Sequence, residues 1–275
     1  MIQEKIKQYE PLSKGARAWE KVEIVRNSKR PSSSELIDFL FDDFFELHGD
    51  RLCGDDKAVI GGVGFFEGIP VTVIAQERGR NTKERQMRNF AMPHPEGYRK
   101  AMRLAQQAER FSRPLICLVD TPGAYPGIEA EERGQAEAIA QCLKCFSSLK
   151  TPVISVVLGQ GGSGGALALS TADKILMFEN AIFSVISPEG FASICWKDSS
   201  RAKEASEIMK ITAKDLYGLG IIDEIIPEAE CGLQEDPVYS FEILREKLTD
   251  ILADLMDKTP ERLVQERISR IRNII

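Results

Sequence analysis

A glycine-rich segment in the middle of the chain carries residues that could do chemistry. Five glycines lie between Gly159 and Gly165, directly after an apolar run at 152–158 and directly before an Ala/Leu-rich segment. This pattern predicts a strand, a glycine turn and a short helix. Backbone N–H groups in such a turn lie beside the partial positive charge of a helix N-terminus and can bind a negative oxygen. That oxygen is either a phosphate or an oxyanion that forms during a reaction.

One interpretation of the segment is a dinucleotide site. Gly159, Gly161 and Gly164 have the spacing G-x-G-x-x-G, and Glu179 ends the next predicted strand. The motif lies in mid-chain, however, and no regular alternation of strands and helices follows Glu179. Both features count against a dinucleotide site without excluding it, so a dinucleotide-dependent oxidoreductase stays open as an alternative function.

A second interpretation is a nucleophile elbow, because the segment also contains G-x-S-x-G centred on Ser163. A serine nucleophile needs a base, which is usually histidine. The chain has only His48 and His94, both far upstream of Ser163, so the order Ser–Asp–His of the α/β-hydrolases cannot be made. This motif therefore gives little support to a hydrolase.

A third interpretation needs no side-chain chemistry. The N–H groups of Gly164 and Gly165, at the start of the predicted helix, can form an oxyanion hole, and glycine lets a substrate oxygen approach closely. The alternative is that the glycines only allow a helix and a strand to pack together. The residues of this segment alone leave both possibilities open.

The elements that must position this segment follow from hydrophobic periodicity. A capping box at Ser32–Glu35 predicts a helix that continues to about Leu47. Further along, the chain shows a hairpin with strands 58–65 and 69–75, buried strands at 114–120, 152–158 and 174–179, a helix that ends near 148, a loop at 92–97, a turn at 187–190 and two closing helices, the second capped by Thr259. Strand–loop–helix units in series imply parallel strands with their loops at one edge, where ligands bind.

Several side chains near these loops are candidate binding residues. Arg78 and Arg80 belong to a basic segment that could contact phosphate groups of a ligand or acidic groups of a partner, or form a solvated helix face. Asp120 and Tyr125 flank a Gly/Pro loop, where they could line a pocket or only shape the turn. Glu189 follows another proline and has the same two interpretations.

Composition limits the classes of protein. The net charge of −6 argues against a nucleic-acid binder, and the longest apolar runs are too short to span a membrane, so we expect a cytoplasmic protein. Six cysteines have no framework spacing and are expected to be reduced. The one CxxC pair, Cys142 and Cys145, lies in a helical pattern without two further ligands at matching spacing, so no metal site is predicted.

Five longer motifs occur in order at 41–64, 88–111, 120–140, 159–169 and 183–198. Together they resemble the α subunit of the carboxyltransferase component of bacterial acetyl-CoA carboxylase, over about Arg30 to Pro227. The chain departs from the family pattern in a shorter N-terminal region, in Gln160 where many members have Glu, and in Glu129 where a small residue is usual.

The resemblance implies the crotonase-type α/β fold, a superhelix of repeated ββα units with flanking helices. We expect an N-terminal arm at 1–30, which is polar and charged, a carboxyltransferase domain at 31–257 and a C-terminal helix at 258–275. The resemblance places the oxyanion hole for the ureido oxygen of biotin at Gly164 and Gly165. Gly161 and Gly162 are candidate substrate-binding residues beside it.

The resemblance also implies carboxyl transfer from carboxybiotin to acetyl-CoA, which gives malonyl-CoA for fatty acid biosynthesis. The implied partners are a zinc-containing carboxyltransferase β subunit on the acetyl-CoA side, a biotin carboxyl carrier protein, and a biotin carboxylase that uses the ATP, with an α2β2 assembly. Two competing functions stay open beside the oxidoreductase: a stand-alone crotonase-type acyl-CoA hydratase or isomerase, and a non-catalytic assembly subunit.

Overall fold

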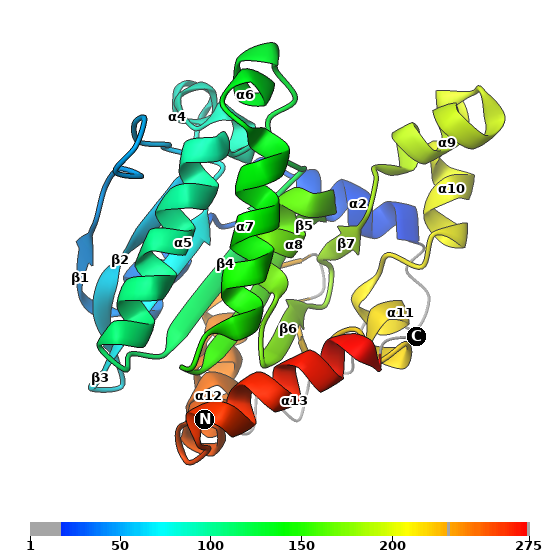
Figure 1. The fold of residues 1–275 in the computed structure, drawn as a ribbon. Helices are drawn as coiled ribbons and strands as arrows, with labels where there is room; N and C mark the ends of the chain where they lie inside the picture. Colours follow the sequence, from blue (N-terminus) through cyan, green and yellow to red (C-terminus); the bar gives the residue numbers. More distant parts are fainter. Residues whose placement is uncertain (1–17, 230–231, 274–275) are drawn as a thin grey trace.

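A mixed sheet of eight strands forms the middle layer of the structure, a computed structural model that describes residues 18–229 and 232–273 (Figure 1). Its strands are β1 (Asp42–Glu46), β2 (Val59–Phe66), β3 (Ile69–Gln76), β4 (Leu115–Thr121), β5 (Val153–Gly162), β6 (Lys174–Phe178), β7 (Ile182–Ser184) and β8 (Glu224–Ile226). The strand order is β1-β2-β3-β4-β5-β6-β8, and β7 pairs with the end of β5. β1, β2 and β3 are antiparallel, whereas the remaining pairs are parallel.

Helices cover both faces of the sheet. They are α2 (Ala18–Arg26), α3 (Ser33–Leu40), α4 (Thr82–Met87), α5 (Pro95–Arg110), α6 (Ile128–Glu132), α7 (Gln135–Ser148), α8 (Ser163–Ser170), α9 (Pro188–Trp196), α10 (Ala202–Ile208), α11 (Ala213–Gly218), α12 (Pro237–Met256) and α13 (Pro260–Arg272), with short 3-10 turns at Asn89–Ala91 and Ser199–Arg201. Helices α5 and α7 lie side by side over the sheet, and α7 packs on α8 (Figure 1). α3 packs on β3 and β4 and contacts α12, while α9 and α10 project from one end of the body (Figure 1).

The helix predicted to continue to Leu47 ends at Leu40, and strand β1 follows. The capping box of Ser32 is present as predicted. β1 pairs with β2, and Gly62 of β2 leaves room for the ring of Phe44 in β1. A Cβ on Gly62 would lie 2.7 Å from Cζ of Phe44. This pairing places the aromatic side chain against the sheet and overrides the helical periodicity of the segment.

Two of the predicted turns are the first turns of helices. The loop predicted at 92–97 ends at His94, because Pro95 is the first residue of α5. The turn predicted at 187–190 is the capped start of α9, where the Ser187 side chain accepts from the N–H of Gly190. Proline fits both positions because it needs no partner for an N–H in the first helical turn.

The other predicted elements are confirmed, within a residue or two, except that β5 continues through the glycines. The hairpin of β2 and β3 turns at Glu67–Gly68, and the buried strands are β4, β5 and β6. Residues 115–121 of β4 are buried throughout, as expected of a parallel strand covered on both faces. The loops after β4 and β5 meet at one edge of the sheet, as the strand–loop–helix pattern predicted.

The two ends of the described chain pack on this body. Residues 1–17 of the predicted arm lie outside the described residues, but α2 buries Val22 and Val25 and contacts β5, β7 and α10. α13 packs on α7 and buries Arg267 completely. In the part of the chain that the structure describes, no helix has the length and apolarity that crossing a bilayer requires.

Candidate functional site

The glycine segment joins the C-terminal end of β5 to the N-terminus of α8. Gly162 is the N-cap residue, and no side chain caps the N–H groups of the first turn. Ser163 has a φ of 52°, a left-handed conformation that non-glycine residues seldom adopt. The chain therefore turns sharply from strand to helix and leaves first-turn N–H groups for another partner.

Most of the glycines are required by close packing. An added Cβ would lie 2.5 Å from Oδ1 of Asp120 at Gly159, 2.6 Å from the Phe183 ring at Gly161, and 2.1 Å from the Pro122 carbonyl oxygen at Gly162. Real Cβ atoms do not approach other atoms so closely. The packing interpretation therefore holds for these three positions, and contact of Gly161 and Gly162 with a substrate stays a prediction.

The proposed oxyanion pair divides into two different environments. A Cβ on Gly165 would lie 2.6 Å from the backbone nitrogen of Ala124, and the residue is buried. A Cβ on Gly164 would meet only Ile139, at 3.6 Å, which is an ordinary contact. Gly164 is half-buried and lines a groove, so there is room for a ligand beside it. The Cβ side of Gly165, by contrast, is filled by the backbone at Ala124.

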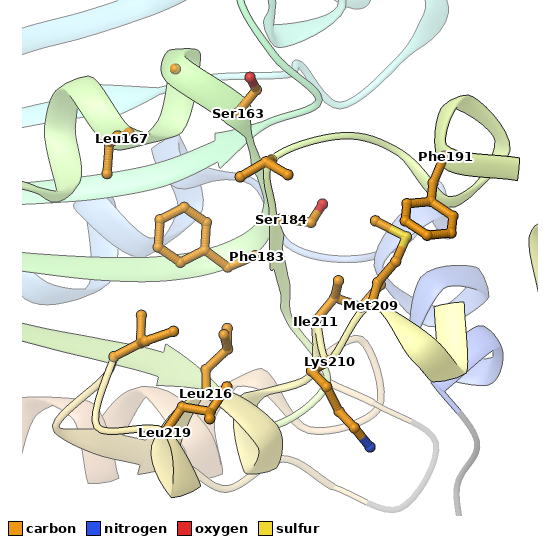
Figure 2. A pocket seen from close by; sticks show the side chains of 13 residues that line it. Ser163, Leu167, Phe183, Ser184, Phe191, Met209, Lys210, Ile211, Leu216 and Leu219 are labelled. Carbon is orange, nitrogen blue, oxygen red and sulfur yellow. The ribbon is translucent and has the colours of Figure 1, made fainter. Parts of the chain in front are cut away.

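The groove beside Gly164 is apolar and has a volume of about 520 Å³. Figure 2 shows Leu167 of α8, Phe183 of β7 and the segment around Met209 on its sides. Its lining consists of Ser163, Gly164, Leu167, Phe183, Ser184, Val185, Phe191, Met209, Lys210, Ile211, Leu216, Leu219 and Ile221. Apolar grooves that contain a few polar groups are the usual form of a small-molecule site.

The apolar walls of this groove were not predicted from the sequence. They come from segments that follow β7 and that precede and follow α11, far apart in the sequence from Ser163. The available signal was weak: Leu167 lies in the motif at 159–169 and Val185 in the motif at 183–198, and their side chains are 47% and 83% exposed. Exposed apolar residues that gather in this way indicate a binding surface.

The serine of the elbow motif has no histidine partner in the described part of the chain. Nδ1 of His48 lies 3.3 Å from Oδ2 of Asp55, and Nδ1 of His94 lies 3.0 Å from Nδ2 of Asn89. No hydrogen bond joins either ring to Ser163 among the described residues. The strained turn has the shape of an elbow without the base that a nucleophile requires.

Glu179, the acidic residue that a dinucleotide site would need, is not available to bind a ribose. Glu179 is buried, its Oε2 accepts from the N–H of Glu228 at 3.3 Å, and its carbonyl oxygen accepts from Nζ of Lys21. A carboxylate in this position cannot reach a ribose hydroxyl. The glycines are packed as described above, so little space is left for a pyrophosphate.

The two candidate arginines have different roles. Arg78 is buried, donates to the carbonyl oxygens of Val25 and Arg30, and lies 3.5 Å from Oδ2 of Asp120 through Nε. It is neither on a solvated helix face nor free to bind a phosphate. Arg80 is half exposed and faces Asp38 at 3.4 Å, so an acidic neighbour on α3 already balances its charge.

Tyr125 and Glu189 contact other parts of the structure. The Tyr125 ring stacks on His94 with centroids 4.1 Å apart, and His94 lines a separate polar crevice of about 470 Å³. Glu189 forms an ion pair with Arg26 of α2 at 2.6 Å, which lowers the pKa of its carboxyl group. Neither residue lines the apolar groove.

The described cysteines are free thiols, and Cys231 lies outside the described residues. Burial raises the pKa of Cys142 well above its ordinary value and that of Cys145 to about 11. Both lie on α7, as the helical pattern predicted. Among the residues that the structure describes, no three His, Cys, Asp or Glu side chains are placed to hold a metal ion.

Known structures define the class of fold. The chain superimposes on transcarboxylase 12S with a TM-score of 0.70 and 19% identity, over 87% of this chain and 45% of that one. It also matches the β subunit of geranyl-CoA carboxylase from P. aeruginosa, with a TM-score of 0.64 and 17% identity over 89% of this chain and 46% of that one. This is the crotonase-type carboxyltransferase fold, as predicted, and the chain spans about half the length of both proteins.

Sequence relatives define the family. Residues 1–275 match the family model described as acetyl co-enzyme A carboxylase carboxyltransferase-like, and the chain belongs to this family. It is 57% identical to the acetyl-coenzyme A carboxylase carboxyl transferase subunit alpha of Clostridium acetobutylicum, over 93% of each chain. It is 54% identical to the subunit of the same name from Listeria innocua, over 94% of this chain and 81% of that one.

These relatives decide between the competing functions. They are carboxyl-transferring enzymes, not acyl-CoA hydratases or isomerases and not dinucleotide-dependent oxidoreductases. The packed glycine segment agrees with the exclusion of a dinucleotide site. The chain is therefore a carboxyltransferase component.

Proposed function

We propose that this chain is the α-type subunit of an acetyl-CoA carboxylase and transfers a carboxyl group from carboxybiotin to acetyl-CoA, which gives malonyl-CoA for fatty acid biosynthesis. The observation that carries the proposal is the uncapped N-terminus of α8, which opens at Gly164 on an apolar groove. Membership of the carboxyltransferase family supplies the class of reaction.

The groove and the helix terminus fit the two chemical parts of biotin. Carboxybiotin, carried by another protein, is the substrate that supplies the carboxyl group. When it loses this group, negative charge remains on the ureido oxygen of biotin. Leu167 and Phe183 offer an apolar surface for the ring and its aliphatic chain. The N–H of Gly164, with the positive end of the helix dipole, offers a donor for the oxygen.

The residues of this chain act mainly by position and electrostatics. A donor that is fixed before the reaction stabilises developing negative charge without reorganisation, and an apolar surrounding strengthens the interaction. The same apolar side chains exclude water, which would otherwise compete for the N–H. In this proposal Gly165 has two roles. Its close packing on the Ala124 backbone holds the turn, and its N–H is a second donor to the oxygen.

The remaining components belong to partners in this proposal. The relatives are named as a subunit alpha, which implies a complex of several subunits. We propose a zinc-containing β subunit on the acetyl-CoA side, a biotin carboxyl carrier protein and a biotin carboxylase that uses ATP, in a cytoplasmic α2β2 assembly. The half-length coverage of transcarboxylase 12S and of the geranyl-CoA carboxylase subunit supports a second chain that completes the site.

The proposal is tested by reconstitution and by variants of one glycine. The chain alone should be inactive, and adding the β subunit should restore malonyl-CoA formation from carboxybiotin and acetyl-CoA. Gly164→Pro removes the N–H at a helix position that tolerates proline. Loss of one oxyanion donor costs about 10²–10³ in rate. Gly164→Ala is the matched control, because it keeps the N–H and its Cβ has room.

The outcomes separate the function from the site. If the complete wild-type complex forms no malonyl-CoA, the proposed function is wrong. If the complex is active and an assembled, folded Gly164→Pro variant transfers carboxyl groups at the wild-type rate, the oxyanion assignment is wrong and the function stands. Circular dichroism and co-purification with the β subunit report folding and assembly.

A further inference from the structure

We propose that Asp120 and Arg30 are positioning residues that hold a bulge in β5 and thereby aim the N–H groups at the start of α8. The inference rests on the proposed function, because it assigns these residues to the orientation of the same donors. Neither side chain is proposed to contact the substrate. The pairing of β4 with β5 is irregular beside both residues.

The two strands pair regularly until just before the glycine segment. Leu115 is opposite Val153 and Val119 is opposite Val157, but the next partners are Thr121 and Gly161. One residue of β4 therefore faces three residues of β5. The two additional residues form a bulge opposite Asp120, and bulges beside functional sites redirect the chain that follows them.

The bulge leaves backbone groups that the neighbouring strand cannot pair, and two buried side chains satisfy them. The N–H of Gln160 donates to Oδ1 of Asp120 at 2.9 Å. The carbonyl oxygen of Leu158 accepts from Nε and Nη2 of Arg30 at 3.2 and 2.6 Å. Buried backbone groups without partners are costly, so these two side chains stabilise the bulge in this form.

Glycine allows the carboxylate to come this close. At Gly159 a Cβ would lie 2.5 Å from Oδ1 of Asp120. Beyond the bulge, Gly161 pairs with Phe183 of β7, and α8 begins two residues later at Ser163. The direction in which the strand enters the helix is therefore set by the groups that hold the bulge.

Both side chains are themselves fixed by buried charges. Arg30 forms two hydrogen bonds with the carboxylate of Glu228, at 2.7 and 2.8 Å, and neither side chain is exposed. Oδ2 of Asp120 lies 3.5 Å from Nε of Arg78. Arg78 in turn donates to the carbonyl oxygens of Val25 and Arg30, which connects the bulge to the end of α2.

Stability alone does not explain the pair of Asp120 and Arg78. Among the described residues, Oδ2 of Asp120 and Nε of Arg78 are buried without a hydrogen bond. A buried ion pair with unsatisfied atoms contributes little to stability and can be replaced by apolar residues without loss. A charge arrangement that costs stability beside a catalytic loop is the kind of feature retained for positioning.

The matched control lies at the opposite end of the same strand. There the N–H of Val153 donates to Oδ2 of Asp173 at 2.8 Å, and Asp173 pairs with Arg267 at 2.7 Å. This aspartate also accepts a β5 backbone N–H and pairs with a buried arginine. It differs from Asp120 in being distant along the strand from the glycine segment.

The experiment compares Asp120→Ala, Asp120→Asn and Asp173→Ala in the reconstituted complex. We expect Asp120→Ala to lower kcat by about 10- to 100-fold, because a shift of about 1 Å in a catalytic group costs up to 10², while KM for acetyl-CoA stays unchanged. Asp120→Asn keeps an acceptor oxygen and should recover most of kcat. Asp173→Ala should lower stability and leave kcat close to wild type.

Hydrogen exchange of the full chain without partners gives a readout that does not depend on activity. Asp120→Ala should accelerate exchange in peptides that cover residues 158–165, and Asp173→Ala should do so only around residue 153. Arg30→Lys provides a second variant, because lysine cannot bind Leu158 and Glu228 together as arginine does. It should lower kcat about tenfold, even if Asp120→Ala fails to fold.

The results separate this proposal from the proposed function. Wild-type kcat in folded Asp120→Ala, or in Arg30→Lys if the former does not fold, would overturn the positioning role while the function stands. An equal loss of kcat in Asp173→Ala would also overturn it, because the effect would then be general destabilisation. If the wild-type complex forms no malonyl-CoA, the proposed function is wrong. If hydrogen exchange at residues 158–165 is unchanged in Asp120→Ala, the role of Asp120 in holding the bulge is wrong.

Discussion

The two ends of strand β5 are held by the same kinds of side chain, but only one end is fully satisfied. At its start, Asp173 accepts the N–H of Val153 and forms two hydrogen bonds with Arg267. The guanidinium also donates to the carbonyl oxygens of Phe146, Leu149 and Thr151, which uses all five of its N–H groups. This end ties α7, β5, β6 and α13 together.

The other end of β5 is less complete. Asp120 accepts the N–H of Gln160, but its second oxygen faces Nε of Arg78 at 3.5 Å without a hydrogen bond. The first turn of α8 that follows is uncapped. One strand therefore combines a structural end, where the Asp173–Arg267 pair is fully hydrogen-bonded, with the end that we propose to be the functional end, where the first helical turn is uncapped. A fully paired buried network makes a fold more rigid, whereas a buried polar group without a partner costs stability.

The largest effect should follow from breaking the structural end. Arg267→Met would leave the buried carboxylate of Asp173 without its partner, and breaking a buried ion pair costs about 3–5 kcal/mol. We expect the free energy of unfolding, measured with urea on the full chain, to fall by about that amount. Arg267→Lys should lose less because it retains the charge. A loss below about 1 kcal/mol would show that this end does not stabilise the fold as its contacts indicate.

A smaller effect should separate the glycines of the functional end. Gly165→Ala places a Cβ 2.6 Å from the backbone nitrogen of Ala124, and overpacking of this kind costs about 1–3 kcal/mol. Gly164→Ala has room, and alanine favours the helix over glycine by up to about 1 kcal/mol, so stability should hold or rise slightly. Thermal unfolding of the two variants measures the difference. Equal midpoints would mean that the segment relaxes more easily than its packing implies.

The sequence predicted most elements of this functional end. The strand, the glycines, the helix behind them and the meeting of two loops at one sheet edge all followed from local pattern. The sequence could not predict that Gly164 has room and Gly165 has none, because their neighbours Ile139 and Ala124 come from other segments. The strand β1 was also missed, since Gly62 of the next strand decides it by making room for Phe44.

The buried polar side chains of this region were the least predictable. Arg30 and Arg78 belong to charged stretches that resemble solvated surface. Each is buried because it pairs with a carboxylate more than forty residues away, Glu228 and Asp120 respectively. Burial of a charge depends on tertiary pairing, which local periodicity does not encode. The register shift between β4 and β5 likewise leaves no local signal apart from the glycines.

Acid should weaken the functional end through Glu228. Burial acts to raise the pKa of this carboxyl group, but the charge and hydrogen bonds of Arg30 outweigh it, and the net shift is below the ordinary value. The unfolded chain therefore binds more protons in the titration range, so stability rises with pH there. The contribution is complete above the unfolded pKa of about 4.3 and is lost as the pH falls through the lower folded value.

Urea unfolding of wild type and Glu228→Gln across pH 3–7 checks this sign. The variant has no carboxylate to titrate at this position, so its stability should fall less steeply in acid, and the difference between the two proteins should shrink as the pH drops. Hydrogen exchange at residues 158–165 should rise in the wild type over the same range. Parallel curves at every pH would show that the pair of Arg30 and Glu228 does not couple protonation to folding.

The smallest effect should come from a salt bridge on the same helix as Arg267. Arg262 donates to Glu266 at 2.6 Å, which is shorter than any contact of Arg267, but both side chains of this pair are largely exposed. Exposed pairs gain little, because water and salt screen them and the side chains lose conformational freedom. We therefore expect Arg262→Ala to leave urea unfolding unchanged in low and high salt, beside the large loss in Arg267→Met. If the two variants lost comparable stability, the burial and complete pairing of Arg267 would not explain why the start of β5 is stable. The stability of that end would then depend on helix α13 as a whole.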